Sequence, residues 1–276
     1  MTDLDDLNTA AADDFADGLS GIFEHAGWVA HTAARLRPFA TVAALHEAMM
    51  EAVRQAPEPD RTAFLNGHPE LGSDKVELTA ESRAEQDALG LQAGTLLLEL
   101  NRGYRERFGI PFIVCVRRHT PANVLRVLRA RLASDVETEH ATALAEVGHI
   151  TRLRLLDRVA GPGRPEMAGR LTTHVLDASS GRPAAGVEVE LLCEDRRVAV
   201  ARTNEDGRAP APLLPPGPVR MGRYEIRFGI GAYWAASGVA SFYDVVPVPF
   251  TVADAEGHYH VPLVASPWSY STYRGS

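Results

Sequence analysis

Three histidines in the second half of the chain, with an arginine and a polar C-terminal stretch, have the types and spacing for acid–base chemistry. His174 lies in the stretch Leu171 to Asp177, and His258 and His260 alternate along a strand-like run that ends at Leu263. Side chains alternate across a strand, so we expect His258 and His260 on one face. A neutral histidine accepts a proton from water near pH 7, an arginine such as Arg208 holds a planar anion, and a tyrosine hydroxyl such as Tyr273 donates to an oxyanion.

Two other interpretations of these histidines have to be weighed. A lone histidine is most often a solvated surface residue, although the convergence of several weakens that view here. His-x-His on a strand plus a third histidine can also form a zinc site with an open position. The permanent charge of Arg208 would oppose a divalent cation, which favours a site without metal. We therefore expect no metal and no cofactor.

The first half of the chain contains a second group of residues with chemical potential. His68 precedes Pro69, and the residue before a proline is pushed out of helical geometry, so the pair could be only a turn. Ser82 and Glu85 have the spacing of a helix capping box, which needs no chemistry. Arg154 could only solvate the exposed face of the last helix. A titratable side chain on a fixed turn is nevertheless a common way to present an acid or base, which favours a functional His68.

Bulk composition limits the classes of partner. The 276 residues carry a formal net charge of −8 and a pI of about 5.7. This net negative charge would repel a phosphate backbone or an anionic membrane surface, so neither nucleic acid nor a membrane is an expected partner. Cys115 and Cys193 have no metal or redox spacing, and no secretory signal or apolar spanning run is present. We therefore expect a cytoplasmic protein. We also expect two domains, because one core seldom serves so many residues.

The elements that position these residues change type near residue 160. From about residue 10 to 160 the apolar period is helical: Val42, Leu45, Met49 and Val53 share one face behind a possible Thr41 cap. A second helix is expected over residues 95–108 with Gly109 ending it, and an extended segment over residues 110–116. The proline- and glycine-rich stretch 161–169 is the expected linker.

Beyond the linker the apolar period falls to two, which predicts strands separated by short turns. That spacing favours an antiparallel β-sandwich over a βαβ fold. The predicted fold is therefore an all-α helical bundle over residues 1–160 and an all-β sandwich over residues 170–276. Strands are expected at residues 171–176, 187–193, 197–201, 224–228, 242–246 and 258–264.

The C-terminal motifs resemble those of 5-hydroxyisourate hydrolase, a transthyretin-like enzyme of urate breakdown. The match covers about the last 110 residues and rests on His174, Arg208, His260 and the terminal Tyr273-Arg274-Gly275-Ser276. The resemblance implies a transthyretin-like sandwich in which His174 and His260 activate water and Arg208 orients the substrate. It further implies that Tyr273 is catalytic, that Arg274, Gly275 and Ser276 contact substrate, and that His258 is at most a supporting residue.

Three N-terminal segments, residues 67–72, 79–86 and 107–114, occur in an order that resembles 2-oxo-4-hydroxy-4-carboxy-5-ureidoimidazoline (OHCU) decarboxylase. The resemblance spans about residues 10 to 160. It implies that His68 is the acid or base, that Glu85 and Gln86 orient the ring, and that Arg154 holds a carboxylate or ring oxygen. The direction of proton transfer stays open. The remaining residues implied to bind substrate are Pro69, Ser82, Phe112, Ile113 and Val114.

Together the two resemblances imply a bifunctional enzyme, because the product of the hydrolase is the substrate of the decarboxylase. It would hydrolyse 5-hydroxyisourate to OHCU and decarboxylate OHCU to (S)-allantoin. The implied partners are these two small molecules and further copies of the chain, as a homotetramer through the C-terminal domain. Two alternatives remain: a transthyretin-like ligand-binding protein, and an enzyme with only one of the two activities.

Overall fold

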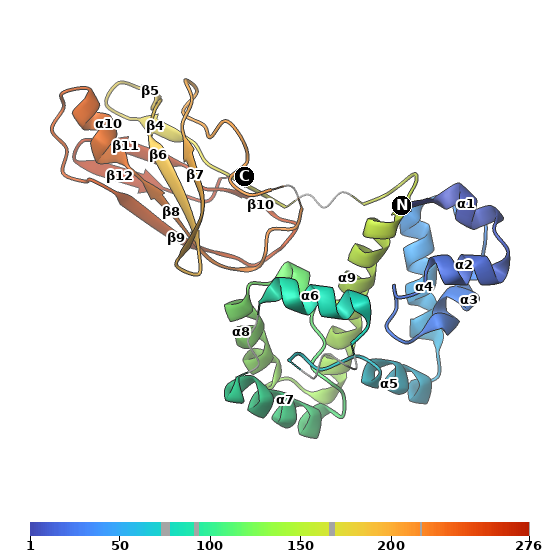
Figure 1. The fold of residues 1–276 in the computed structure, drawn as a ribbon. Coiled ribbons are helices and arrows are strands. Elements are labelled where there is room, and N and C mark those ends of the chain that lie inside the picture. Colours follow the sequence, from blue (N-terminus) through green and yellow to red (C-terminus); the bar gives the residue numbers. More distant parts are fainter. Residues whose placement is uncertain (73–77, 91–93, 166–168, 216, 276) are drawn as a thin grey trace. The chain divides into compact units, whose positions relative to one another are not determined.

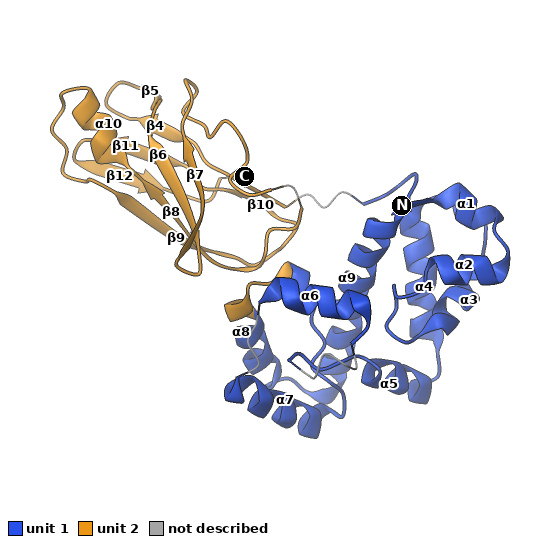
Figure 2. Ribbon diagram, in the orientation of Figure 1, with its two compact units in different colours: residues 1–117, 124–166 blue, residues 118–123, 167–276 orange. Residues whose placement is uncertain are grey.

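The computed structural model describes residues 1–72, 78–90, 94–165, 169–215 and 217–275. The chain divides into two compact units, one formed by residues 1–117 and 124–166, the other by residues 118–123 and 167–276 (Figure 2). Each unit is described separately.

Unit 1 is helical in the part that the structure describes (Figure 1). A two-residue parallel pair, β1 (Thr2–Asp3) with β2 (Val159–Ala160), also belongs to this unit, so it is mainly rather than purely α-helical. A 3₁₀ turn, η2, spans Val116–Arg118. The helices are α1 (Leu4–Thr9), α2 (Ala12–Gly18), α3 (Gly27–Ala34), α4 (Val42–Gln55), α5 (Glu58–Asn66), α6 (Ala80–Leu89), α7 (Thr95–Phe108), α8 (Pro121–Arg131) and α9 (Val136–Arg158).

Two helices of unit 1 begin and end where their sequences predict. The Thr41 hydroxyl accepts a hydrogen bond from the Ala44 amide at 3.0 Å and caps α4, whose predicted apolar face is buried. Helix α7 ends at Gly109, whose φ of 70° is the left-handed conformation that glycine adopts readily. The segment between α7 and η2 contains neither helix nor strand, and Val116, the last residue of the predicted extended segment, lies in η2.

Unit 2 is β-rich. One four-stranded sheet has the order β12-β11-β4-β5, a second has the order β7-β6-β8-β9, and β3 pairs with β10. The second sheet is antiparallel throughout, but β4–β11 and β3–β10 are parallel, so the prediction of a purely antiparallel fold is wrong. The strands are β3 (Arg170–Thr172), β4 (Val175–Asp177), β5 (Arg182–Pro183), β6 (Glu188–Cys193), β7 (Arg196–Arg202), β8 (Gly222–Phe228), β9 (Val246–Val252), β10 (His258–His260), β11 (Leu263–Ser266) and β12 (Ser269–Thr272).

Three further departures from the predicted strands have physical causes. The strand expected at residues 242–246 lies instead at β9, where Pro247 and Pro249 argue against a strand. Both are tolerated because β9 is an edge of its sheet, where the missing amide hydrogen is not needed. A short helix, α10 (Ile230–Ala236), interrupts the β-fold. The strands expected at residues 171–176 and 258–264 are each broken into two.

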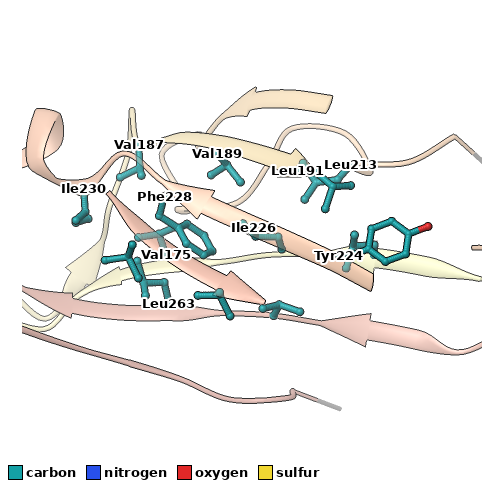
Figure 3. Close-up of a cluster of buried hydrophobic side chains, with 14 of the residues drawn as sticks. Val175, Val187, Val189, Leu191, Leu213, Tyr224, Ile226, Phe228, Ile230 and Leu263 are labelled. Carbon is teal, nitrogen blue, oxygen red and sulfur yellow. The ribbon is translucent and has the colours of Figure 1, made fainter. Parts of the chain in front are cut away.

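Side chains from both four-stranded sheets form one apolar core, which makes the arrangement a sandwich (Figure 3). Val175 and Leu263 enter the core from β4 and β11, while Leu191 and Ile226 enter from β6 and β8. All four are fully buried. The core therefore holds β4 and β11, the strands that come next along the chain after His174 and His260.

Candidate functional sites

His68 lies just beyond the end of α5 and is buried, with 8% of its surface exposed. Its Nδ1 lies 3.1 Å from the carbonyl oxygen of Phe64, and a carbonyl can only accept, so Nδ1 carries the proton. In the neutral ring Nε2 is then an acceptor. Burial lowers the pKa of His68 to about 4, which leaves the ring neutral near pH 7. The geometry presents a neutral imidazole with one fixed tautomer.

The nine N-terminal residues predicted to form a site line one cavity. They come from the turn after α5, from α6, from the segment between α7 and η2, and from α9. The cavity is only about 40 Å³, well below the ~300 Å³ of a typical small ligand pocket, so a ligand requires some lining side chains to move. The lining residues are His68, Pro69, Leu71, Ser82, Glu85, Gln86, Phe112, Ile113, Val114, Val116, Ile150 and Arg154.

Arg154 is the most heavily bonded side chain of this cavity. Its Nε and Nη2 donate to the two carboxylate oxygens of Glu85 at 3.1 and 2.8 Å. Nη2 also donates to the Ser82 hydroxyl at 3.0 Å, and Nη1 donates to Glu24 at 2.9 Å and to the Gly21 carbonyl at 3.2 Å. All five N–H groups of the guanidinium are therefore used within the protein. A substrate carboxylate can bind Arg154 only if one of these partners is released.

Sequence reasoning missed Glu24, a buried carboxylate with 2% of its surface exposed. It accepts hydrogen bonds from the hydroxyls of Thr79 at 2.7 Å and Ser82 at 2.9 Å, besides the one from Arg154. Burial alone would raise the pKa of Glu24, but these three bonds outweigh it and hold that pKa below its ordinary value. The one sequence signal for Glu24 is its place directly after the apolar pair Ile22-Phe23. The structure shows that this pair is buried.

The capping-box interpretation of Ser82 is wrong. Helix α6 begins at Ala80, and its cap is Thr79, whose hydroxyl accepts from the Ser82 amide at 3.2 Å. The Ser82 hydroxyl lies between Glu24 and Arg154 instead. Arg154 likewise does not solvate an exposed face, because only 5% of its surface is exposed.

Backbone contacts hold the other walls of the cavity. The Gln86 side-chain oxygen accepts from the Gly72 amide at 3.1 Å. On the segment between α7 and η2, the Ile113 carbonyl accepts from Arg131 Nη1 at 2.8 Å, and Arg131 Nε donates to the fully buried Glu139 at 2.8 Å. An ion pair behind the cavity therefore fixes the backbone that lines it.

Acid should destabilise unit 1 through two neutral histidines, the buried His68 and the half-buried His46. Burial lowers both pKa values from 6.5 to about 4. The unfolded chain therefore binds more protons between these values, and stability present above pH 6.5 is lost as the pH falls towards 4. The loss is about 3 kcal/mol for each histidine, since one pKa unit corresponds to about 1.4 kcal/mol. Urea unfolding followed by circular dichroism at 222 nm, at pH 7 and pH 4.5, measures it, and a His46→Gln variant should show a smaller difference.

In unit 2, His174, Arg208 and His260 lie where regular strands stop. His174 stands between β3 and β4 and forms an isolated antiparallel bridge with Arg208, while His260 ends β10 and bridges Gly275. The Gly275 amide donates to the His260 carbonyl at 2.8 Å. A Cβ at Gly275 would lie 2.4 Å from the His260 ring, so only glycine permits this approach. Strand breaks and a close glycine contact therefore present these side chains.

The histidines of unit 2 interact electrostatically. Burial, followed by the charge of Arg208, lowers the pKa of both His174 and His260. The His174 ring bonds the backbone of Asp206, and its Nε2 is buried without a hydrogen-bond partner in the described part of the chain. Such a ring is neutral near pH 7 and has one nitrogen available to take a proton.

His258 and His260 share one face of β10, as predicted. The hydroxyl of Thr172 lies 3.0 Å from His258 Nε2 and 3.0 Å from His260 Nδ1, while Tyr259 points into the core. Sequence reasoning did not single out Thr172, although a hydroxyl on the neighbouring strand β3 orients both rings. His258 is exposed and His260 is half-buried.

The C-terminal residues are only partly brought to this cluster. Gly275 contacts His260, but Tyr273 is 58% exposed. Arg274 lies over the ring of Tyr259, with its guanidinium carbon 5.1 Å from the ring centre. Ser276 lies outside the described residues.

The described residues contain neither a candidate metal site nor a helix that could span a membrane. Among residues whose positions are described, no group of three or more His, Cys, Asp or Glu side chains could hold a metal ion. Within the same residues, every helix is too short or too polar to cross a bilayer.

Comparisons with known proteins agree with the two-unit division. The OHCU decarboxylase family matches residues 8–156, and the HIUase/Transthyretin family matches residues 171–275. A crystal structure of (S)-allantoin synthase is 33% identical over the whole of both chains, with a TM-score of 0.55.

Each half of the chain also has relatives of its own. An OHCU decarboxylase of Haloferax volcanii is 38% identical over 56% of this chain and 95% of that protein. A 5-hydroxyisourate hydrolase of Deinococcus radiodurans is 53% identical over 38% of this chain and 95% of that protein. The chain belongs to the OHCU decarboxylase family and joins to it a C-terminal domain of the HIUase/Transthyretin family, which makes it an enzyme with a decarboxylase half and a hydrolase half.

Proposed function

We propose that the chain carries out two consecutive steps of urate degradation. Its C-terminal half hydrolyses 5-hydroxyisourate to OHCU, and its N-terminal half decarboxylates OHCU to (S)-allantoin. One observation carries the proposal: the nine residues expected at a decarboxylase site line one cavity, in a chain whose other half clusters His174, Arg208 and His260. The agreement of both family matches with one solved (S)-allantoin synthase supports it.

In the hydrolase half, His174 and His260 are the pair that activates the attacking water, and one of the two rings takes up its proton as the water oxygen bonds to the substrate. Both pKa values lie below the ordinary value, so both rings are neutral bases near pH 7. Arg208 orients the anionic ring of the substrate, and the Tyr273 hydroxyl donates to the developing oxyanion. The Gly275 amide donates to the His260 carbonyl, which brings Gly275 to the histidines. The family resemblance assigns substrate binding to Arg274, Gly275 and Ser276.

The dependence of the hydrolase on pH should reveal Arg208. Because the pKa values of both histidines are lowered, the acid limb of kcat/KM should have its midpoint below pH 6.5. In Arg208→Gln the positive charge is gone, so the pKa of each histidine rises and the limb moves to higher pH, besides an overall loss of rate. Stopped-flow measurement of 5-hydroxyisourate decay between pH 5 and 8 checks this, and an unmoved limb would remove Arg208 from the electrostatics of the pair.

In the decarboxylase half, the ring of OHCU accepts the electron pair left when carbon dioxide departs, so no cofactor is required. The protein positions the substrate and moves a proton. His68 is the acid–base group, because its Nε2 lone pair is available in the neutral tautomer that Phe64 selects. Glu85 and Gln86 orient the ring, and Arg154 binds the substrate carboxylate once its bonds to Glu85 open.

We further propose a homotetramer assembled through the C-terminal domain in the cytoplasm. Tyr273 and the strand β12 are exposed in the single chain, which leaves them available to a neighbouring copy. Light scattering that showed a fully active monomer would overturn this assembly.

The decisive test of the function generates 5-hydroxyisourate from urate with urate oxidase and adds the chain. Rapid loss of ultraviolet absorbance together with a growing circular dichroism signal is expected, because a stereospecific second step yields one enantiomer. Loss of absorbance without optical activity would leave only the hydrolase. No acceleration of either step would favour a transthyretin-like binding protein.

A further inference from the structure

Glu24 holds Arg154 from outside the cavity. It is not among the lining residues of the decarboxylase cavity, whereas Ser82, Glu85 and Arg154 are. Its Oε2 accepts from Arg154 Nη1 at 2.9 Å and from the Ser82 hydroxyl at 2.9 Å. Glu85 binds the opposite edge of the guanidinium, through Nε and Nη2. The two carboxylates therefore have different places around one cation.

The backbone is shaped to bring Glu24 inward. The next residue, His25, has a φ of 50°, in the left-handed region that a residue with a side chain seldom adopts. Such residues cluster at functional sites. The Glu24 side chain is 1% exposed, and that of His25 is 58% exposed. The turn therefore directs the two neighbouring side chains in opposite senses and commits Glu24 to the buried network.

The charge balance distinguishes the two carboxylates. An arginine between two carboxylates has one more negative partner than it needs, so Glu85 can be released to the cavity while Glu24 keeps the guanidinium neutralised. Without Glu24, Glu85 would be the only protein counter-ion of the buried Arg154 cation. Arg154 would then hold Glu85 more tightly, and the cation would pass through an unpaired state before a substrate carboxylate could replace Glu85, which is costly. The cavity is also too small for a ligand unless a lining contact opens.

We propose that Glu24 is a positioning residue of the decarboxylase half. It anchors one end of the Arg154 guanidinium and the Ser82 hydroxyl, so that the edge paired with Glu85 becomes available to the carboxylate of the substrate. This assignment rests on the proposed decarboxylation of OHCU.

The test is a Glu24→Gln variant of the full chain, assayed with OHCU made in situ. Gln keeps the size and one acceptor but removes the charge, so KM for OHCU should rise about tenfold or more, because Glu85 is then held by Arg154. The KM of the hydrolase half should not change. A merely structural role would lower the folded fraction, and hence the apparent kcat, without raising KM.

The matched control is Glu47→Gln, because Glu47 also pairs with an arginine, Arg54, but its side chain is 70% exposed and outside the cavity. Glu47→Gln should leave the KM for OHCU and the KM of the hydrolase half unchanged. A Glu24→Gln variant with decarboxylase KM within twofold of the unmodified chain would overturn the proposal.

A second variant distinguishes the loss of the positioning role from a failure to fold. If Glu24→Gln loses its helical circular dichroism signal, Thr79→Val removes one hydrogen bond to Glu24 but keeps its charge. KM should then rise only a few-fold, about the effect of one lost hydrogen bond, and an unchanged KM would overturn the assignment. If the unmodified chain itself fails to form optically active product, the proposed function fails instead, and the assignment fails with it.

Discussion

Replacing His68 with asparagine should reduce decarboxylation of OHCU by about 10³-fold, the usual scale for loss of a positioned acid–base group. Asparagine can still donate to the Phe64 carbonyl but cannot exchange a proton near pH 7. KM should change little, because Arg154, Glu85 and Gln86 remain in the cavity. The hydrolase half of the same chain should keep its rate, which gives an internal measure of active protein.

His46→Asn is the matched control for this variant. His46 is a second histidine of unit 1 whose pKa burial lowers to about 4, but its Nε2 bonds the Thr151 hydroxyl at 2.9 Å away from the cavity lining. Its decarboxylase rate should stay close to that of the unmodified chain. The formation of (S)-allantoin, followed by circular dichroism, measures both variants, and an active His68→Asn chain would end the assignment of His68 as acid or base.

The second large effect is expected from His260→Asn in the hydrolase half. Two rings share the Thr172 hydroxyl, at 3.0 Å each, but only His260 is half-buried and in contact with Gly275. Its loss should lower the enzyme-catalysed rate of 5-hydroxyisourate hydrolysis, measured after the uncatalysed decay is subtracted, by about 10²- to 10³-fold. Decarboxylation of OHCU formed by that slow decay should continue.

His258→Asn provides the comparison, because it removes the same type of side chain from the same face of the same strand. Its ring is exposed, so the expected loss is less than tenfold. Initial rates of absorbance decay with each variant decide the matter. Equal losses from both would mean that the pair acts through Thr172 rather than through His260 alone.

Helical periodicity and capping predicted the parts of unit 1 that depend on local forces. The four apolar residues of α4 and the glycine that ends α7 occupy the predicted positions, because a buried stripe and a left-handed glycine are properties of a few neighbouring residues. The Ser82 interpretation failed because two hydroxyls, three residues apart, could both cap α6. Only tertiary contacts with Glu24 and Arg154 decide between them.

Glu24 could not be predicted because its partners are distant in sequence. Thr79 and Arg154 lie 55 and 130 residues away, and no local pattern states that a chain will bring them together. In unit 2, the prolines of β9 concealed a strand because a sequence does not say which strand is an edge. The parallel pairs likewise depend on crossings between strands far apart along the chain.

The separation between site and core in unit 2 has an evolutionary consequence. His174, Arg208 and His260 stand at strand breaks, and none of them belongs to the apolar core that joins the two sheets. Mutation can therefore remove the reactive groups at little cost in folding free energy, since surface changes away from core, caps and strained residues usually cost less than ~0.5 kcal/mol. A lineage that loses its chemistry keeps a foldable scaffold, on which natural selection can build a non-catalytic binding surface.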